Sequence, residues 1–303
     1  MVGVLCDCLL LYPRRCTHGH LLQEEAVVVV NSLAEVGIDH LLEAFNDAFS
    51  DYDVPMQMDK TQLVRHMHTN GCSLDDSVGL FDEERLVGFL LVARRTTTAY
   101  DGGTGIRVAY RGQGLAHLLI DEAIKHTAKR GCTSFVLEVL DTNERAKKLY
   151  EKHGFATIRT LACHRRERPT PLREGTLKLE QQSELCLGRG ECQPSWQYSE
   201  QSLKAGSYTG FAIVCNRETV GTLCLDTKRG MIAQIFIEPN QRRRGYAKEA
   251  LLAAQALCES DHLSFYNVDT ACLDLQGFLA AVGFHCVLTQ SEMHRSLTPQ
   301  ARA

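Results

Sequence analysis

The chain has 303 residues, of which 44% are hydrophobic and 23% charged, with a formal net charge of -4 at pH 7. This length is too great for one ordinary core and fits two globular domains of about 130–150 residues each. The weakly acidic balance excludes a general binder of nucleic acids or anionic membrane surfaces, so we expect neither nucleic acid nor membrane as a partner.

Thirteen cysteines are scattered through apolar segments without a paired framework. An odd number of dispersed thiols is typical of reduced, mostly buried cysteines in a cytoplasmic protein. The sequence therefore predicts a cytoplasmic location and no need for a disulfide.

Residues 1–25 match neither domain and are predicted to form a poorly ordered extension. Val2 to Tyr12 is apolar, but it lacks a basic start, is broken by Asp7 and is too short to span a bilayer. It predicts neither a signal peptide nor a membrane helix. Soft metal ligands gather in the same span, namely Cys6, Cys8, Cys16, His18 and His20. Their spacing fits no standard zinc site, so we expect no metal.

The first domain, residues 26–164, begins with a predicted strand over 27–30 and two predicted helices. The helices cover 38–49 and 61–69, and Asn70-Gly71 ends the second. A hairpin follows, with strands over 78–81 and 86–93, and a third strand covers 97–108. Asp101-Gly102-Gly103 interrupts this third strand, which indicates a bulge or a close approach of the backbone to a ligand.

A turn with two glycines then joins the strand to a helix that runs to Arg130. The stretch reads Ile106-Arg107-Val108-Ala109-Tyr110-Arg111-Gly112-Gln113-Gly114-Leu115-Ala116. Successive amides in such a turn, with the unsatisfied donors of the helix start, point at one spot and suit a pyrophosphate. Arg111 is predicted to add a fixed charge at the rim. The alternative is plain turn chemistry without a ligand.

A buried strand over 135–139 and a helix over 143–153, closed by Gly154-Phe155, follow this loop. The pattern Arg111-x-x-Gly114-x-Ala116 resembles the acyl-CoA-binding motif of the GNAT superfamily of N-acyltransferases. Asn143-x-x-Ala146-x-x-Leu149-Tyr150-x-x-x-Gly154-Phe155 resembles the second hallmark of that family. The resemblance implies an α/β fold, with a mixed, mostly antiparallel twisted sheet flanked by helices.

The resemblance also implies acetyl-CoA as co-substrate and assigns roles to residues. Amides at the end of the third strand would polarise the thioester carbonyl, and the phenol of Tyr150 would protonate the departing thiolate. Asn143 would contact the pantetheine or a buried water, or only N-cap its helix. The expected cofactor-binding residues are Ile106, Arg107, Val108, Arg111, Gly112, Gln113, Gly114, Leu115, Ala116 and Asn143.

The general base is predicted to be Glu138, on the strand beside the cleft. Asp101 at the strand interruption is the alternative, and a chain of water molecules would replace either. A third alternative gives Glu138 no role beyond contact with solvent or with a Lys or Arg side chain.

Residues 165–175 combine dense charge with two prolines and are predicted to be a solvated linker. The chain then repeats its pattern over 176–298, with strands over 211–215, 219–225 and 231–237, a helix over 248–258 and a strand over 263–268. The chain is thus identified as a tandem GNAT protein, with two repeats, of the bacterial type.

The second repeat keeps the acyl-CoA pattern in Arg242-x-x-Gly245-x-Ala247. A possible second CoA site comprises Ile237, Arg242, Arg243, Arg244, Gly245, Tyr246 and Ala247, and the alternative is a solvated basic turn. Counting back from Gly283 as from Gly154, Leu279 stands in the place of Tyr150 and Cys272 in that of Asn143. An aliphatic side chain cannot protonate a thiolate, so the second repeat is predicted to be degenerate and the first catalytic.

The sequence therefore predicts an acetyl-CoA-dependent N-acetyltransferase that promotes direct attack by a primary amine of a small molecule or peptide. It would act as a monomer or homodimer. One alternative is a thiol-biosynthetic acyltransferase similar to mycothiol synthase, a tandem GNAT whose second half is active, and Leu279 argues against it. The other is a non-catalytic acyl-CoA-binding sensor, against which the intact set from Arg111 to Tyr150 argues.

Overall fold

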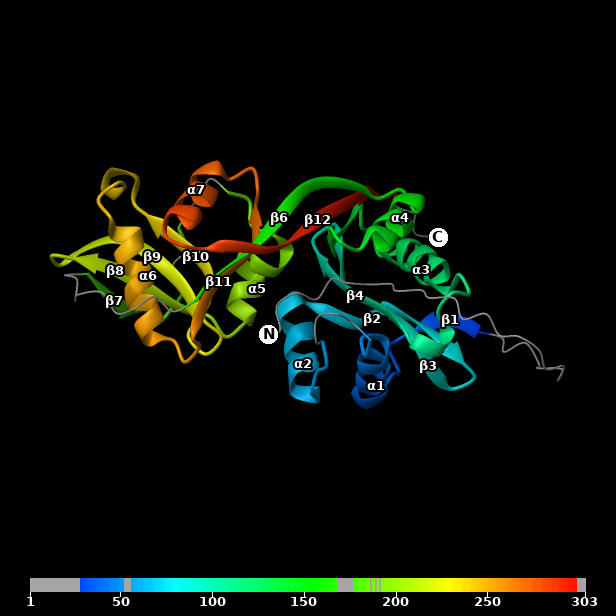
Figure 1. The fold of residues 1–303 in the computed structure, drawn as a ribbon. Helices are drawn as coiled ribbons and strands as arrows, with labels where there is room; N and C mark the ends of the chain where they lie inside the picture. The colour runs from blue at the N-terminus through cyan, green and yellow to red at the C-terminus, as the bar shows by residue number, and fades with distance from the viewer. Residues whose placement is uncertain are drawn as a thin grey trace. The chain divides into compact units, whose positions relative to one another are not determined.

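The computed structural model describes residues 28–51, 56–167, 177–185, 187, 188, 190 and 192–298. The chain divides into two compact units (Figure 1). The N-terminal unit comprises the described residues up to Ile158 and those from Ser291 onward, and the C-terminal unit comprises Arg159–Gln290. The predicted extension over residues 1–25, with its metal-binding alternative, lies outside the described residues.

The N-terminal unit contains every helix and strand that the sequence predicts for it. They are β1 Val28–Ser32, α1 Ile38–Ala48, α2 Lys60–Asn70, β2 Cys72–Asp82, β3 Arg85–Arg95, β4 Thr98–Ile106, α3 Leu115–Lys129, β5 Ser134–Leu140 and α4 Glu144–Lys152. Local chemistry sets their ends. Asp59 and Gln62 form a capping box at the start of α2, and Gly71, with φ +77°, ends it in the left-handed conformation.

Two layers of helices cover the sheet of this unit, α1 and α2 on one face and α3 and α4 on the other (Figure 1). The side chains of β3 alternate between them. Phe89 and Leu91 pack in the core with α1, while Leu90 and Val92 pack in the core with α3. Because both faces are covered, the middle of β3, from Leu86 to Ala93, is buried throughout, which explains its continuous apolar run.

Strands β4 and β5 pair over a short length only. Their parallel ladder runs from Thr98↔Ser134 to Tyr100↔Val136, although β4 continues to Ile106 and β5 to Leu140. At the point where this pairing stops, a bulge at Gly102 shifts the β3–β4 register. A Cβ on Gly102 would lie 2.3 Å from the sulfur of Cys72, so only glycine fits there. The bulge predicted at residues 101–103 is confirmed.

The C-terminal unit repeats this plan. Its elements are β7 Lys178–Gln181, α5 Glu200–Ala205, β8 Thr209–Cys215, β9 Glu218–Asp226, β10 Met231–Ile237, α6 Tyr246–Leu257, β11 His262–Asp269 and α7 Leu273–Ala281. The repeat extends to details. The bulge recurs at Ala233 of β10, and the only β10–β11 pair among the described residues is Met231↔Ser264. Neither β7 nor α5 was predicted from the sequence.

The last strand of each repeat extends into the other unit. After Ile158, β6 (Ala156–Glu167) belongs to the C-terminal unit, where it pairs antiparallel with β11. From Ser291, β12 (His285–Ser296) belongs to the N-terminal unit, whose core includes Met293. Each unit thus contains part of the strand that ends the other repeat.

Strand β6 also continues to Glu167, into the segment predicted to be a linker. The dense charge of this segment predicted a solvated linker, but Arg166 is buried. Its guanidinium lies 4.9 Å from the centroid of the Phe284 ring and donates to the carbonyl oxygen of Val282 at 3.2 Å. The rest of the predicted linker, residues 168–175, lies outside the described residues, and the predicted domain limits remain predictions.

The part of the chain that the structure describes contains no candidate membrane helix. None of its helices is both long enough and apolar enough to span a bilayer.

Candidate active site

The loop between β4 and α3 has the form of an anion cradle. Gly112 and Gly114 adopt left-handed conformations, with φ of +82° and +76°, and Gly114 is the N-cap of α3. Among the described residues, the first-turn amides of Leu115 and Ala116 have no hydrogen-bond acceptor. A Cβ on either glycine would meet nothing within 4 Å, so this side of the loop is open. Free amides at an open helix start suit a phosphate group.

A cavity of about 470 Å³ adjoins this cradle. Gly114, Ala116 and His117 line it from α3, and basic residues line it from α4. The remaining lining residues are Glu144, Arg145, Lys148, Leu149 and Lys152. The volume and the cationic wall fit the phosphates of acetyl-CoA, the co-substrate that the resemblance implies.

Arg111 does not present its charge to the cradle. Its guanidinium makes two hydrogen bonds to Asp51, of 2.8 and 3.0 Å, and one of 2.5 Å to the carbonyl oxygen of Ala48. Its Nε donates to the carbonyl oxygen of Ile106 at 3.2 Å. The side chain therefore connects the loop to Asp51, to the end of α1 and to β4. The prediction that it lies at the rim of the cradle is wrong.

The amides of Arg107 and Val108 already have acceptors. Arg107 N donates to the carbonyl oxygen of Val87 at 2.9 Å, and Val108 N donates to Asp47 Oδ1 at 2.9 Å. The Arg107 side chain is buried and donates to Glu43 and to the carbonyl oxygen of Leu86. Neither amide is thus available to polarise a carbonyl group, because both hold the loop in place.

Strand geometry instead points to Thr104 and Ile106 as donors. Successive residues of a strand direct their N–H and C=O groups to opposite sides. Since Arg107 N–H faces β3, the amides of Ile106 and Thr104 face away from β3, toward the part of β5 that makes no ladder with β4. Ile106 was predicted from the sequence, whereas Thr104 was not.

Tyr150 reaches from α4 to the bulge of β4. Its hydroxyl donates to Asp101 Oδ2 at 3.0 Å. Its ring packs edge-on against the ring of Phe155, with 5.7 Å between the ring centroids. The same Asp101 oxygen accepts from Thr104 Oγ1 at 2.7 Å, and Asp101 Oδ1 accepts from Gly103 N at 2.9 Å. The predicted proton donor thus belongs to a buried cluster at the point where β4 and β5 separate.

Burial changes the acidity of the carboxyl group in this cluster. Asp101 is 1% exposed, and removal from water raises its pKa, although hydrogen bonds from Thr104, Gly103 and Tyr150 oppose the rise. Asp101 therefore holds a proton more readily than an exposed aspartate. A perturbed carboxyl group next to a phenol is typical of a proton-transfer site.

Glu138, the predicted base, is fully buried on β5. The last residue of β5 that pairs with β4 is Val136, and Glu138 lies two residues beyond it. Leu137 and Val139 pack in the core with α3 and α4, so strand alternation turns Glu138 to the opposite face of the sheet. The solvent-facing alternative is therefore wrong, and the role as a base remains a prediction.

Asn143 is the N-cap of α4, and its Oδ1 accepts from Ala146 N at 3.1 Å. Of the alternatives that the sequence left open, the capping role is the one that the geometry shows. A contact with pantetheine remains a prediction.

The second repeat has apolar residues in the places of this cluster. Asp101 and Gly103 flank the bulge of β4 as Ile232 and Gln234 flank that of β10. By the same alignment Ile235 corresponds to Thr104. Counting back from Gly283 as from Gly154, Leu279 corresponds to Tyr150. Ile232, Ile235 and Leu279 pack in or against one apolar core. The carboxyl, the hydroxyl and the phenol are thus all absent from the second repeat.

The loop of the second repeat keeps the form of the cradle. Gly245 has φ +88° at the N-cap of α6, and Arg243, in the place of Gly112, has φ +62°. Arg242 Nε donates to the carbonyl oxygen of Ile237 at 3.1 Å, as Arg111 does to Ile106. Arg243, Arg244 and Gly245 are exposed, and Tyr246 and Ala247 are half-buried. The duplication therefore preserved the backbone of this loop but not the proton-transfer cluster.

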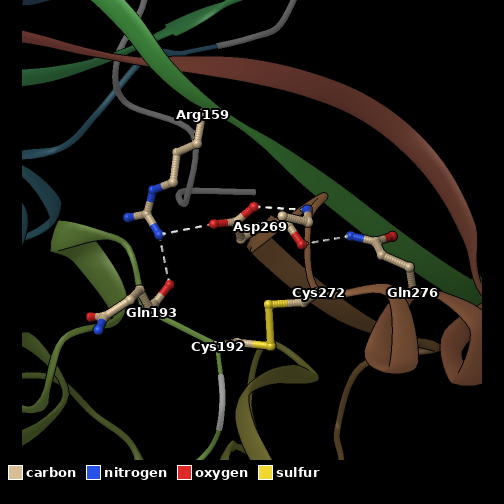
Figure 2. The surroundings of a disulfide bond; sticks show 7 residues. Arg159, Cys192, Gln193, Asp269, Cys272 and Gln276 are labelled. Atoms are coloured by element: carbon tan, nitrogen blue, oxygen red, sulfur yellow. Dashed lines mark hydrogen bonds and ion pairs between the residues drawn. A yellow bond between two sulfur atoms is a disulfide. The ribbon is translucent and has the colours of Figure 1, made fainter.

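A disulfide joins Cys192 to Cys272, the residue in the place of Asn143 (Figure 2). Its Cα atoms are 5.8 Å apart, a usual distance for a disulfide. Arg159 holds the adjacent segments through Asp269, at 3.3 Å, and the carbonyl oxygen of Gln193, at 2.7 Å. The prediction that all thiols are reduced is wrong for this pair, because sequence spacing does not reveal which distant cysteines meet.

Removing this disulfide is expected to destabilise the protein. The bond joins residues 80 positions apart, and closing a loop of that size stabilises a fold by roughly 2–5 kcal/mol. Cys192→Ser should therefore lower the melting temperature by several degrees, and dithiothreitol should lower that of the wild type alone. Cys286→Ser, which changes an exposed free cysteine, is the control. Equal melting of wild type and Cys192→Ser without reductant would contradict the assignment.

Known proteins are similar to this chain in sequence. The sequence profile of the acetyltransferase (GNAT) family matches residues 38–155 and 176–284, one match in each repeat. The mycothiol acetyltransferase of Corynebacterium efficiens is 30% identical over 115 residues, which cover 38% of this chain and 39% of that protein. The match thus spans well under half of that relative.

Solved structures agree over nearly the whole chain. A tandem GNAT protein from the clavulanic acid biosynthesis pathway has a TM-score of 0.65 at 13% identity and covers 91% of this chain and 100% of its own. A GCN5-related N-acetyltransferase from Sphaerobacter thermophilus has a TM-score of 0.63 at 11% identity, with coverages of 91% and 98%. At such identities the likeness concerns the fold. Since the family profile matches most of the sequence, and does so twice, the chain belongs to the GNAT acetyltransferase family, with two GNAT domains in tandem.

Proposed function

We propose that the protein is an acetyl-CoA-dependent N-acetyltransferase and that the N-terminal unit performs the reaction. The observation that carries this proposal is the buried cluster of Tyr150, Asp101 and Thr104 at the divergence of β4 and β5. The C-terminal unit has only apolar residues in those places.

Acetyl-CoA would supply the acetyl group as a thioester. The cradle from Gly112 to Ala116 would bind its pyrophosphate, and Arg145, Lys148 and Lys152 would add positive charge beside it. Arg111, Arg107 and Asn143 keep the loop and α4 in position. The amides of Thr104 and Ile106 would donate hydrogen bonds to the carbonyl oxygen as negative charge develops there.

Tyr150 would act as the general acid and Asp101 would position it. A phenol ordinarily holds its proton at neutral pH, and the bond of Tyr150 to Asp101 directs the hydroxyl to the side of the bulge. Glu138 would take the proton of the attacking amine, directly or through water, from its place on the diverging part of β5.

The proposed acceptor is a primary amine of a small molecule or peptide. The fold does not select among such amines, because one fold supports many acceptors. We propose a monomer or homodimer that acts without a metal ion. The cytoplasmic location also remains a proposal, and the disulfide weakens its support from the cysteines.

A second candidate is acetyl transfer to an amine of a thiol-biosynthetic precursor. The name of the Corynebacterium efficiens relative favours it. In the mycothiol-synthase-like alternative the second half is the active one. Leu279 and Ile232 argue against this, because neither side chain can transfer a proton. A non-catalytic sensor is disfavoured by the intact cluster around Tyr150.

The test is a panel of amine acceptors with acetyl-CoA, followed by release of the free thiol. The panel should contain amino sugars, including an aminoglycosyl thiol precursor, amino acids, polyamines and peptides with a free N-terminus. Thiol release that depends on an acceptor supports the proposal and identifies the amine class. CoA binding without release for any acceptor would favour the sensor.

A further inference from the structure

Three polar side chains form a hydrogen-bonded row that ends at the cavity beside the cradle. Asp121 Oδ1 lies 2.9 Å from His153 Nδ1, and His153 Nε2 lies 2.8 Å from His117 Nδ1. Asp121 and His117 are one turn apart on α3, and His153 is the C-cap of α4. Of the three, His117 lines the cavity, next to Gly114 and Ala116 of the cradle.

The row determines which nitrogen atoms carry protons. A carboxylate only accepts, so His153 Nδ1 donates to Asp121. Burial lowers the pKa of His153, which favours its neutral ring with Nε2 as an acceptor. His117 Nδ1 must then be the donor to His153. This leaves Nε2 as the atom of His117 that gains or loses a proton.

The same bonds argue against a metal site. The two nitrogen atoms that face each other share a hydrogen atom, so neither offers a lone pair to an ion. The row is suited to holding protons rather than a metal.

The charges around the row favour an anion in the cavity. Arg145, Lys148 and Lys152 line it from α4, and the one acidic lining residue, Glu144, lies 3.5 Å from Lys148. A further cation, Arg295 of β12, donates to the carbonyl oxygen of His153. A phosphate in the cavity would therefore meet mainly positive charge, and would favour a protonated His117 in turn.

The second repeat supplies an internal comparison. His117 is the third residue after Gly114, and the third residue after Gly245 is Lys248. In the places of Asp121 and His153 stand Leu252 and Val282. The second repeat thus has a permanent cation at this position and lacks both groups that orient the histidine.

We propose that His117 binds a phosphate of the CoA pyrophosphate as an imidazolium, oriented by His153 and Asp121, so that CoA binding takes up a proton. The inference rests on the proposed function, because it takes CoA as the ligand of the cradle. Histidine is the side chain that changes charge between pH 5 and 8, so the affinity for CoA should fall as the pH rises through this range.

Isothermal titration calorimetry with dephospho-CoA tests the proposal, since this probe lacks the 3′-phosphate that itself titrates near neutral pH. Binding to the wild type should weaken between pH 6 and 8, by up to about tenfold per pH unit for one linked proton. At pH 7, titrations in PIPES and imidazole buffers, which differ in ionisation enthalpy, should show uptake of a fraction of one proton.

The variants separate this role from a structural one. His117→Gln should abolish proton uptake and flatten the pH dependence, while His126→Gln, on the same helix but away from the cavity, should preserve both. Asp121→Asn changes a half-exposed side chain and should reduce the uptake without unfolding the protein. If His117→Gln binds dephospho-CoA too weakly to titrate, the proton uptake of Asp121→Asn provides the test.

Three results would overturn the inference alone: wild-type binding without proton uptake, unchanged uptake in His117→Gln or in Asp121→Asn, or loss of uptake in His126→Gln. Absence of CoA binding to the wild type would instead overturn the proposed function, and this inference with it.

Discussion

Tyr150→Phe is expected to lower kcat by roughly 10²–10⁴-fold and to leave the Kd of CoA nearly unchanged, because the substitution removes only the hydroxyl that protonates the leaving thiolate. The ring of phenylalanine retains the edge-on contact with Phe155. Asp101 loses one of its donors but keeps those from Thr104 and Gly103. Steady-state rates with acetyl-CoA and calorimetric titration with CoA measure the two effects separately.

The unit provides a matched control in Tyr110, whose hydroxyl also donates to a carboxylate, Asp82, at 2.5 Å. That pair joins the loop to the β2–β3 turn and has no role in the proposed proton transfer. Tyr110→Phe deletes the same kind of bond, so its kcat should stay within a few-fold of the wild type. If Tyr150→Phe were equally active, another group would have to protonate the thiolate and the assignment to Tyr150 would be wrong.

The parts of the fold that local chemistry determines were predictable from the sequence. Three- and four-residue spacing placed α1, Gly71 marked the end of α2, and two adjacent glycines marked the bulge of β4. The cradle also follows from local chemistry, because Gly112 and Gly114 must adopt positive φ and a helix start always leaves free amides.

Contacts between distant residues were not predictable. The motif led us to expect that Arg111 faces a phosphate. Its actual partner, Asp51, lies sixty positions away in the sequence, and nothing in the motif indicates that contact. The bond between Tyr150 and Asp101 spans 49 positions. Spacing reveals the face on which a side chain lies but not the partner that it meets there.

The exchange of the last strands was hidden for a related reason. The sequences of β6 and β12 mix apolar with charged and polar residues, so they do not show to which unit either strand belongs, because both repeats have the same plan. Only the pairing of β6 with β11 and the burial of Met293 in the N-terminal core show where each strand lies.

Gly114→Glu is expected to abolish acetyl transfer, whereas Gly245→Glu should leave a rate within a few-fold of the wild type. At either position the new side chain places a carboxylate at the start of a helix, where it would compete with a phosphate for the same amides. The two glycines have φ of +76° and +88°, and both have open space where a Cβ would lie. The conformational cost to folding is therefore similar, about 1–2 kcal/mol.

Because these costs match, a difference in activity reports which cradle serves the reaction. The expected asymmetry follows from the proton-transfer cluster, since a phosphate bound at Gly245 would bring a thioester toward Ile232 and Leu279, which have no proton to give. Gly114→Ala and Gly245→Ala separate backbone strain from charge and should both remain active. Thermal melts of all four variants exclude unfolding as the cause. An inactive Gly245→Glu that melts normally, beside an active Gly114→Glu, would move the reaction to the C-terminal unit and favour the mycothiol-synthase-like alternative.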